Sequence, residues 1–428
     1  MIAQVKSQKY LQGVVNINRV FVTGIGLISA LGLSNQENWE NLTKGRSGVK
    51  KITLFDSNLT KTKIAAEVSK GLDELIVNAI PKRSARQMTR VTKMGLLATK
   101  MAIDDSLISW DQHEKERCGV ILGIVSTSGI VNKSFSSLET DPKFQIIKRM
   151  NNALPAWISI KYGLKGPSFS VCSGCASSAH AIATGFDLVR SGMADVMVVG
   201  GADSSINPED IRGFNDLLAL SERYEFPETV SSPFDQNRDG FVMGEGAGIL
   251  ILESENSAIR RKANIYAELL GYGTTSEAFN IMQPEKGGEG MARTMSLALR
   301  NCDLQPGQVG YINAHGTSTS YNDYYETLAI KKIFGQHAYN LKVSSTKSML
   351  GHTLGAAGAV EAIVSVKSMF HQLVTPTINY HNPDPKCDLD YVPNESIPHD
   401  FDIALSNSFA FGGHNVSLVF KKANTNQS

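Results

Sequence analysis

The sequence predicts an α/β protein built from two interlocked halves, and three observations lead to this class. Short apolar runs typical of buried strands alternate along the chain with segments of helical periodicity, as in proteins built on parallel sheets. The 428 residues exceed what a single small core requires. No Pro- or Ser-rich linker separates the halves near residue 262, and no convincing internal repeat is visible.

The expected organisation is a loose N-terminal extension (1–17), a first half (18–262), a second half (263–422) and a short tail (423–428). The extension lacks the apolar core of a secretory leader, and no segment has the ~20 apolar residues that cross a bilayer. Lys and Arg total 42 against 41 Asp and Glu, which argues against nucleic acid. We therefore expect a soluble, cytoplasmic protein with no membrane or nucleic-acid partner.

The first half is expected to begin with a strand in RVFVTGIGLISALG (19–32), where Val and Phe alternate before two glycines. A dinucleotide-binding turn needs a third glycine, so no such cofactor is expected. A helix (90–107) and a buried strand (118–126) follow. The half continues as a β-α-β unit with parallel strands: a strand (165–173), a helix (176–192) and a strand (194–202).

A second set of elements shows the same alternation. One helix is expected over 291–303, and another, rich in small residues, over 355–372. The expected strands cover 246–254, 265–274, 309–318 and 341–348, and a final pair around a glycine turn covers 404–422.

Five cysteines form an odd, scattered set, which is typical of reduced thiols in the cytosol. Cys172 and Cys175 form a C-x-x-C pair, but no second pair follows, so a zinc ribbon or a thioredoxin-like site is not expected. No carboxylate at ligand spacing accompanies His315 or His352. No metal is therefore expected.

Cys175 lies at the predicted junction between a strand and a helix. Unpaired N–H groups and the positive end of the helix dipole lie beside a sulfur at such a position, which favours the thiolate. Cys172 remains within the strand pattern and is interpreted as a packing residue. His180 would turn away from Cys175 along the helix, so we interpret it as a buried histidine with satisfied hydrogen bonds.

Three later loops place polar side chains at the ends of buried strands, where α/β proteins build their sites. They are NAHGTST around His315, STKSMLGHT around Lys347 and His352, and NSFAFGGHN around Phe411. Glu361 lies in the apolar stretch GAAGAVEAIVSV, where an ionised carboxylate needs a partner. Lys347 is the nearest such partner in the sequence, and a buried pair would fix the loop of His352.

Six motifs in this order resemble the elongating β-ketoacyl-acyl carrier protein synthases, condensing enzymes of the thiolase superfamily. They are RVFVTGIGLISALG, SVCSGCASSAH, PFDQNRDGFVMGEGAG, YINAHGTST, VSSTKSMLGHTLGAAGAVEA and NSFAFGGHN. The resemblance implies a thiolase-like five-layered α-β-α-β-α fold of two related halves, usually a dimer. It also implies decarboxylative Claisen condensation of an acyl thioester with malonyl-acyl carrier protein, in fatty acid or polyketide synthesis and without an organic cofactor.

The same resemblance assigns roles to residues of the middle motifs. Cys175 matches the acyl-accepting nucleophile, and His315 and His352 match the two active-site histidines. Lys347 and Glu361 match the supporting pair.

In the last motif, Phe411 matches a gating phenylalanine whose backbone N–H would form an oxyanion hole with that of the nucleophile. Gly412 belongs to the same turn, where glycine allows close backbone approach, and is assigned with Phe411 to the oxyanion hole and gate. In the stretch PFDQNRDGFVMGEGAG we interpret Asp235, Arg238 and Asp239 as residues that tie loops together.

Several departures and rivals remain. A thiolase needs a second cysteine in the final glycine turn, and AFGGHN has none. A primer-loading synthase usually pairs its cysteine with one His and one Asn, whereas the two histidines here favour elongation. Cys172, Gly174 and Ala410 depart from common family residues near the nucleophile and the gate, which leaves chain length and substrate open. The alternatives are the catalytic subunit of a heterodimeric type II polyketide synthase and a non-condensing subunit that sets chain length.

Basic residues in PKRSARQMTRVTK can share one face. We expect Lys82, Arg83, Arg86 and Arg90 to steer an acidic carrier protein by long-range attraction. The alternative is an ordinary solvated helix face. The expected partners are thus acyl carrier protein and a second subunit, either identical or related.

Overall fold

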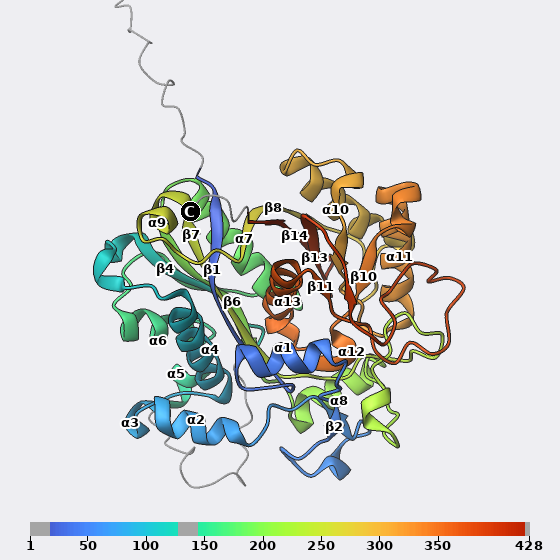
Figure 1. Cartoon of the computed structure of the whole chain (residues 1–428). Helices are drawn as coiled ribbons and strands as arrows, with labels where there is room; N and C mark the ends of the chain where they lie inside the picture. The colour runs from blue at the N-terminus through green and yellow to red at the C-terminus, as the bar shows by residue number, and fades with distance from the viewer. Residues whose placement is uncertain (1–17, 127–143, 424–428) are drawn as a thin grey trace, which may run out of the picture.

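The structure is a computed structural model that describes residues 18–126 and 144–423 (Figure 1). The expected N-terminal extension (1–17) lies outside the described residues, and so does the expected tail (423–428) beyond its first residue.

The core of the molecule is a mixed β-sheet arrangement to which both halves contribute (Figure 1). The first half supplies β1 (Val20–Ile28), β4 (Cys118–Gly123), β5 (Ser168–Val171), β6 (Val196–Asp203) and β7 (Gly246–Ser254). The second half supplies β8 (Ala267–Ser276), β9 (Tyr311–Asn313), β10 (Lys342–Ser344), β13 (Ile403–Ala410) and β14 (His414–Lys422). Among the described residues these ten strands are hydrogen-bonded in the order β10-β9-β13-β14-β8-β1-β7-β6-β4-β5.

The two groups of strands have the same topology. Read outward from the junction, the first half runs β1-β7-β6-β4-β5 and the second runs β8-β14-β13-β9-β10. In each group the first two pairings are antiparallel and the next two are parallel. The prediction of two related, interlocked α/β halves is therefore confirmed, although the relationship lies in the topology and is not visible in the residues.

Helices complete a layered arrangement. The outer helices are α4 (Arg90–Ser106) and α6 (Ala153–Tyr162) on the first half, and α10 (Glu289–Asn301) and α11 (Ser320–Phe334) on the second. Between the two groups of strands lie α7 (Ser177–Arg190) and α13 (Ala357–His371), which pack against each other and against strands of both groups (Figure 1). This arrangement gives the α-β-α-β-α layers that the motifs imply.

The shorter elements connect these layers. The helices are α1 (Asn35–Thr43), α2 (Gly71–Ala79), α3 (Lys82–Ala85), α5 (Gln145–Arg149), α8 (Pro208–Asp216), α9 (Glu255–Arg260) and α12 (Lys347–Leu350). Two short strand pairs are β2 (Lys50–Lys51) with β3 (Ile64–Ala65), and β11 (Leu373–Val374) with β12 (Ile397–Pro398).

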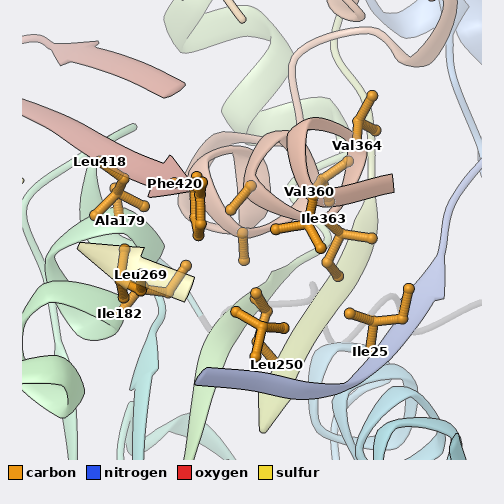
Figure 2. Packing of buried hydrophobic residues seen from close by; sticks show 14 of the residues in the cluster. Ile25, Ala179, Ile182, Leu250, Leu269, Val360, Ile363, Val364, Leu418 and Phe420 are labelled. Carbon is orange, nitrogen blue, oxygen red and sulfur yellow. The ribbon is translucent and has the colours of Figure 1, made fainter. Parts of the chain in front are cut away.

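The middle layer owes its close packing to small residues. A Cβ atom on Gly358 of α13 would lie 2.8 Å from the Cβ of Ala179 on α7, so only glycine allows this approach. Around this contact, one apolar cluster gathers side chains from both middle helices and both groups of strands (Figure 2). The labelled members include Ile25, Leu250, Leu269, Leu418, Phe420, Ala179, Ile182, Val360 and Ile363. The small-residue stretch of the sequence therefore builds the centre of the molecule.

Three details differ from the sequence-based expectations. The strand expected over 341–348 ends at Ser344, and Lys347 begins the short helix α12. Cys172 is exposed and not packed, because it follows β5, the outermost strand of its half. His180 is only partly buried, but its ring nitrogens bond the hydroxyls of Ser173 and Thr274, so its hydrogen bonds are satisfied as expected.

In the part of the chain that the structure describes, no helix combines the length and the apolar character that crossing a bilayer requires.

Candidate active site

A cavity of about 400 Å³ lies where strand ends of the two halves meet. Cys175 lines it from the first half, and His315, His352, Phe411 and Gly412 line it from the second. Residues far apart in the sequence are thus brought to one space, as the motifs predicted. A cavity of this size is typical of a small-molecule site.

The nucleophile position is a tight turn between β5 and α7. Gly174 has a φ of +58°, which suits glycine, and its carbonyl accepts hydrogen bonds from the N–H and the hydroxyl of Ser177 at 3.0 and 2.6 Å. The Ser177 hydroxyl in turn accepts the N–H of Ser173 at 2.9 Å. These bonds fix the backbone on both sides of Cys175, directly before the first turn of α7.

The thiol of Cys175 is protonated at neutral pH. Burial raises its pKa to about 12, although the positive charge of Lys347 acts in the opposite direction. Burial of the sulfur therefore opposes the thiolate that the start of the helix was predicted to favour. The sulfur must lose its proton during the reaction and does not store negative charge beforehand.

His315 follows β9 and is held by a buried carboxylate. Glu326 of α11 accepts the backbone N–H groups of His315 and Gly316 at 2.9 and 2.8 Å. Gly316 has a φ of +36°, and a Cβ there would lie 2.5 Å from the Cβ of Ser345, so this turn requires glycine. Lys347 donates to the carbonyl and to Nδ1 of His315 at 2.7 and 3.3 Å.

His352 is fixed from the other side of the cavity. Its N–H donates to the carbonyl of Val242 at 2.7 Å, and its Nδ1 accepts the N–H of Leu354 at 3.3 Å. Phe241 packs edge-on against its ring, with the centroids 5.3 Å apart. The rings of His315 and His352 lie almost perpendicular, with centroids 5.4 Å apart.

Both imidazoles are neutral donors. Burial, followed by the charge of Lys347, lowers the pKa of His315 and of His352 well below the usual value for histidine. An ammonium group and a backbone N–H only donate, so Nδ1 accepts in each ring and the remaining proton is on Nε2. The pair can therefore offer two N–H groups to a developing negative charge.

Lys347 and Glu361 form the buried ion pair that the sequence suggested. The Nζ of Lys347 donates to Oε1 of Glu361, and both side chains are almost inaccessible to solvent. Burial raises the pKa of Glu361 to about 7, although Lys347 opposes this shift. Because the ammonium also bonds the carbonyl of His315, the pair orients the loop of that histidine from behind.

The final turn matches the expected gate in position but corrects one assignment. Phe411 is partly exposed at the cavity between β13 and β14, and Gly412 and Gly413 have positive φ values of 82° and 71°. The N–H of Gly412 donates to the carbonyl of Ile281 at 2.8 Å, so Gly412 is a turn residue and not an oxyanion donor. Within the described residues, the N–H of Phe411 has no hydrogen-bond partner, and the N–H of Cys175 bonds only its own sulfur.

The basic face is smaller than predicted. Lys82, Arg83 and Arg86 are exposed on and directly after α3. Arg90 instead binds Glu245 through Nη2 and Nε at 2.6 and 2.8 Å. The prediction of Arg90 as a free cation for a carrier is therefore wrong, because its guanidinium is committed to a buried carboxylate from a distant segment.

The residues interpreted as loop ties have that role. Asp235 accepts the N–H groups of His381 and Asn382 at 2.8 and 2.6 Å, and Asp239 pairs with Arg223 at 3.0 Å. Arg238 joins several loops and is considered further below.

Sequence reasoning missed two acidic residues of the site. The residues of α11 show no apolar periodicity in the sequence, so nothing indicates there that the carboxylate of Glu326 is buried. Burial raises the pKa of Glu326 to about 7. Glu277 lines the cavity and accepts Asn415 Nδ2 at 2.9 Å. In the described ranges, no group of three or more His, Cys, Asp or Glu side chains is arranged to hold a metal ion.

A partly buried thiol at a strand-helix turn, two neutral imidazoles and a thiolase-like two-part fold define a class. This class is the cysteine-dependent condensing acyltransferases, as the motifs predicted.

Comparisons with known proteins narrow the class. Residues 17–258 match the family model "Beta-ketoacyl synthase, N-terminal domain", and residues 266–381 match "Beta-ketoacyl synthase, C-terminal domain". The chain is 42% identical over 410 residues to the 3-oxoacyl-[acyl-carrier-protein] synthase 2 of Synechocystis sp., covering 94% of this chain and 98% of the relative. The chain belongs to the β-ketoacyl synthase family, and it is an elongating member.

Solved structures agree with this assignment. The ishigamide ketosynthase/chain length factor matches with a TM-score of 0.86 and 32% identity, covering 95% of this chain and 100% of the other. A type II PKS acyl-carrier protein in complex with its ketosynthase matches with a TM-score of 0.84, 32% identity and the same coverage. The predicted thiolase-like fold is confirmed.

Proposed function

We propose that Cys175 carries the growing acyl chain as a thioester and condenses it with a malonyl group delivered by acyl carrier protein. The observation that carries this proposal is one cavity lined by a thiol and by two neutral imidazoles that each keep a proton on Nε2. Fatty acid and polyketide synthesis both use this reaction.

In the first step the sulfur of Cys175 attacks the acyl thioester of a loaded carrier. A C–S bond forms to Cys175, the C–S bond to the carrier breaks, and the thiol proton ends on the carrier's sulfur. A protonated resting thiol suits this exchange, because the proton is needed by the leaving group.

In the second step the malonyl carboxylate leaves as carbon dioxide. Its bonding electrons form an enolate, whose oxygen accepts Nε2–H donors from His315 and His352. The carbanion attacks the thioester carbonyl on Cys175, and a C–C bond forms. The N–H groups of Cys175 and Phe411, which bond no other residue of the described ranges, support the resulting oxyanion. Collapse releases the β-ketoacyl carrier, and Cys175 takes a proton from solvent.

A second subunit pairs along β5 in this proposal. The outer edge of β10, at the other end of the sheet, is covered by the Asp390 carbonyl, which accepts the N–H of Val343. Among residues 18–126 and 144–423, no backbone group bonds the outer edge of β5, and Phe169 on it is 41% exposed. The partner is a second copy or a related subunit, such as the chain length factor that accompanies a similar ketosynthase. Phe169→Lys should convert the dimer to a monomer in light scattering.

The carrier is steered by Lys82, Arg83 and Arg86 in this proposal. Their exposure supports it, and a similar ketosynthase is known in complex with an acyl-carrier protein. The free thiols of the described residues fit a reducing compartment, so we propose a cytoplasmic location.

The test is reconstitution with purified carriers. The protein is incubated with an acyl carrier and a malonyl carrier, and the products are followed by mass spectrometry and by release of carbon dioxide. The proposal expects a β-ketoacyl carrier with equimolar carbon dioxide. Acyl exchange without carbon–carbon bond formation would overturn it.

A further inference from the structure

We propose that Arg238 is a positioning residue, which holds the loop 316–320 in the shape that carrier-bound substrate requires. The inference rests on the proposed function and adds to it a residue that does not touch the cavity. Arg238 lies in the segment between β6 and β7, whereas the loop follows His315 in the other half of the chain.

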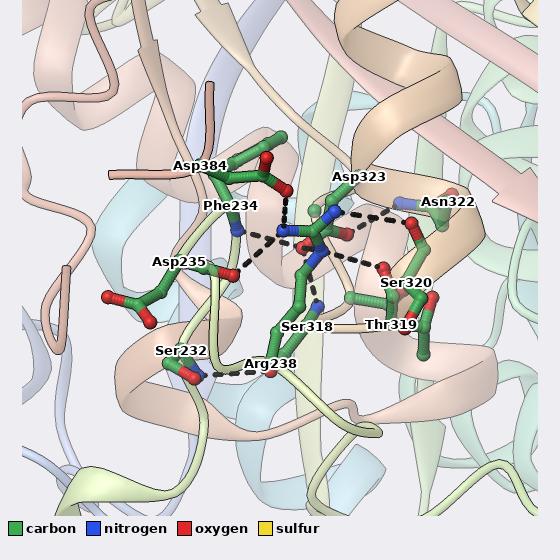
Figure 3. Close-up of polar contacts among 12 residues, drawn as sticks. Ser232, Phe234, Asp235, Arg238, Ser318, Thr319, Ser320, Asn322, Asp323 and Asp384 are labelled. Atoms are coloured by element: carbon green, nitrogen blue, oxygen red, sulfur yellow. Dashed lines mark hydrogen bonds and ion pairs between the residues drawn. The ribbon is translucent and has the colours of Figure 1, made fainter. Parts of the chain in front are cut away.

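The contacts of Arg238 are specific and buried (Figure 3). Its side chain is 5% exposed, and Nε and Nη2 donate to the carbonyls of Thr319 and Ser320, both at 3.2 Å. Nη1 donates to the carbonyl of Asp235 at 2.8 Å and to Oδ2 of Asp384 at 2.7 Å. One planar guanidinium therefore joins three separate segments, a geometry that lysine cannot reproduce.

The same loop is held at Ser318 by the chain around Arg238. The N–H of Ser232 donates to the Ser318 hydroxyl at 3.1 Å, and the N–H of Gly240 donates to its carbonyl at 3.0 Å. Oδ2 of Asp323 accepts the N–H of Ser318 at 3.1 Å. Ser318 has a φ of +66°, a conformation that costs a non-glycine residue free energy and persists only where neighbours enforce it.

The position of the loop explains why its shape matters. Thr317, Thr319 and Ser320 line the cavity, and the hydroxyls of Thr317 and Thr319 lie 2.8 Å apart. The loop runs from the buried His315 to Tyr321, which is 60% exposed and also lines the cavity. In the proposed function, carrier-bound substrate reaches Cys175 along this wall, and the loop contacts parts of the substrate away from the reacting carbons.

This placement predicts how a variant fails. Loss of contacts made equally in the bound and transition states raises KM and leaves kcat nearly unchanged. A residue that only stabilises the fold would lower the melting temperature without changing KM. Arg261 provides the matched control, because its side chain is 9% exposed, binds the Glu253 carboxylate at 2.7 Å and donates to the Ser106 carbonyl at 2.7 Å, away from the cavity.

The experiment compares the full-length wild type with Arg238→Gln, Arg238→Lys and Arg261→Gln. For each we measure the melting temperature, the rate at which iodoacetamide alkylates Cys175, and kcat and KM for acyl and malonyl carriers. We expect Arg238→Gln to raise KM for the carriers about tenfold with kcat and alkylation within about threefold of wild type. Arg238→Lys should recover part of the loss, and Arg261→Gln should lower the melting temperature with KM unchanged.

Unchanged KM in Arg238→Gln, or an equal KM rise in Arg261→Gln, would overturn the inference while the proposed function stands. Failure of the wild type to condense would overturn the proposed function and this inference with it. If Arg238→Gln does not fold, Asp384→Ala and Asp384→Asn replace it, because the first removes a partner that fixes the guanidinium of Arg238 and the second removes only its charge, which loosens the hold of Arg238 on the loop. Both variants should raise KM in the same direction by a smaller factor, and an unchanged KM contradicts the inference.

Discussion

Two connections between a strand and a helix occupy the same topological place in the two halves, but they contain different functional residues. In the first half, β5 leads through a short turn with Cys175 into α7; in the second, β10 leads through Lys347 and His352 into α13. Each connection follows the outermost strand of its half and precedes a helix of the middle layer. One scaffold position thus provides the nucleophile from one half and its electrostatic surroundings from the other.

The two connections also differ in charge. The turn at Cys175 is fixed by neutral groups, the hydroxyls and backbone of Ser173 and Ser177. The second connection contains the buried pair of Lys347 and Glu361. The difference teaches that, of these two connections, the second carries the buried charges, while the first is a rigid but uncharged turn.

The strongest way to break this comparison is to remove the nucleophile. Cys175→Ala should lower condensation by at least about 10³-fold, because the covalent intermediate cannot form. Product is measured as the β-ketoacyl carrier by mass spectrometry. Cys172→Ala is the matched control, since Cys172 is an exposed thiol three residues earlier, and it should retain condensation. Equal losses in both variants would contradict the assignment of the nucleophile.

Removing a donor from the second half should separate the two steps. His315→Ala or His352→Ala should lower condensation by roughly 10²–10³-fold, the usual effect of losing one donor to a developing oxyanion. Acyl transfer to Cys175, followed by intact mass, should fall much less. If acyl transfer falls as far as condensation, the histidines serve the thiol and not the enolate.

Substitution of Lys347 tests whether the buried charge of Glu361 in the second half needs a partner. Lys347→Met leaves Glu361 unpaired and should lower the free energy of unfolding by about 3 kcal/mol, measured in urea. Burial raises the pKa of Glu361 to about 7 even with Lys347 present, and loss of Lys347 raises it further, so the variant should already regain stability as the pH falls towards 7 and the carboxyl takes up a proton. The double variant Lys347→Met/Glu361→Gln should recover most of the loss, and additivity of the two changes would contradict direct pairing.

The rate of alkylation reports the protonation state of Cys175, the thiol that the first half supplies. With the pKa of Cys175 near 12, the thiolate fraction and the iodoacetamide rate should rise about tenfold per pH unit from pH 7 to 9, without a plateau. Peptide mass mapping separates Cys175 from Cys172. A plateau below pH 8 would show that the helix field, and not burial, sets the state of the thiol.

The smallest effect concerns the carrier. Reversal of charge at Arg83 and Arg86 should raise the carrier KM about threefold at low salt and less at high salt, since the attraction is long-ranged and screened. Arg90→Gln should instead lower stability, because it leaves Glu245 without its partner. A KM that does not respond to the reversal would make α3 an ordinary solvated face.

The sequence predicted well what depends on local pattern. Strand and helix alternation, the turn at Cys175 and the pairing of Lys347 with Glu361 follow from periodicity and from the cost of a buried charge. The order of the strands could not be predicted from the sequence, because the two halves share a topology but not a visible repeat of residues.

Long-range contacts and burial account for the errors. Arg90 looked free because its partner, Glu245, lies far along the chain. Glu326 gave no signal because its role is to accept backbone N–H groups. The thiolate prediction rested on the helix dipole, which is local, whereas the burial of the sulfur that opposes it depends on the whole fold.

Mass spectrometry of the trapped acyl group tests most directly whether the two halves act on one sulfur. After incubation with an acyl carrier alone, the acyl mass should be found on the peptide that contains Cys175, and addition of malonyl carrier should remove it as the β-ketoacyl product with carbon dioxide. An acyl group on another residue, or one on Cys175 that malonyl carrier leaves in place, would contradict the proposal.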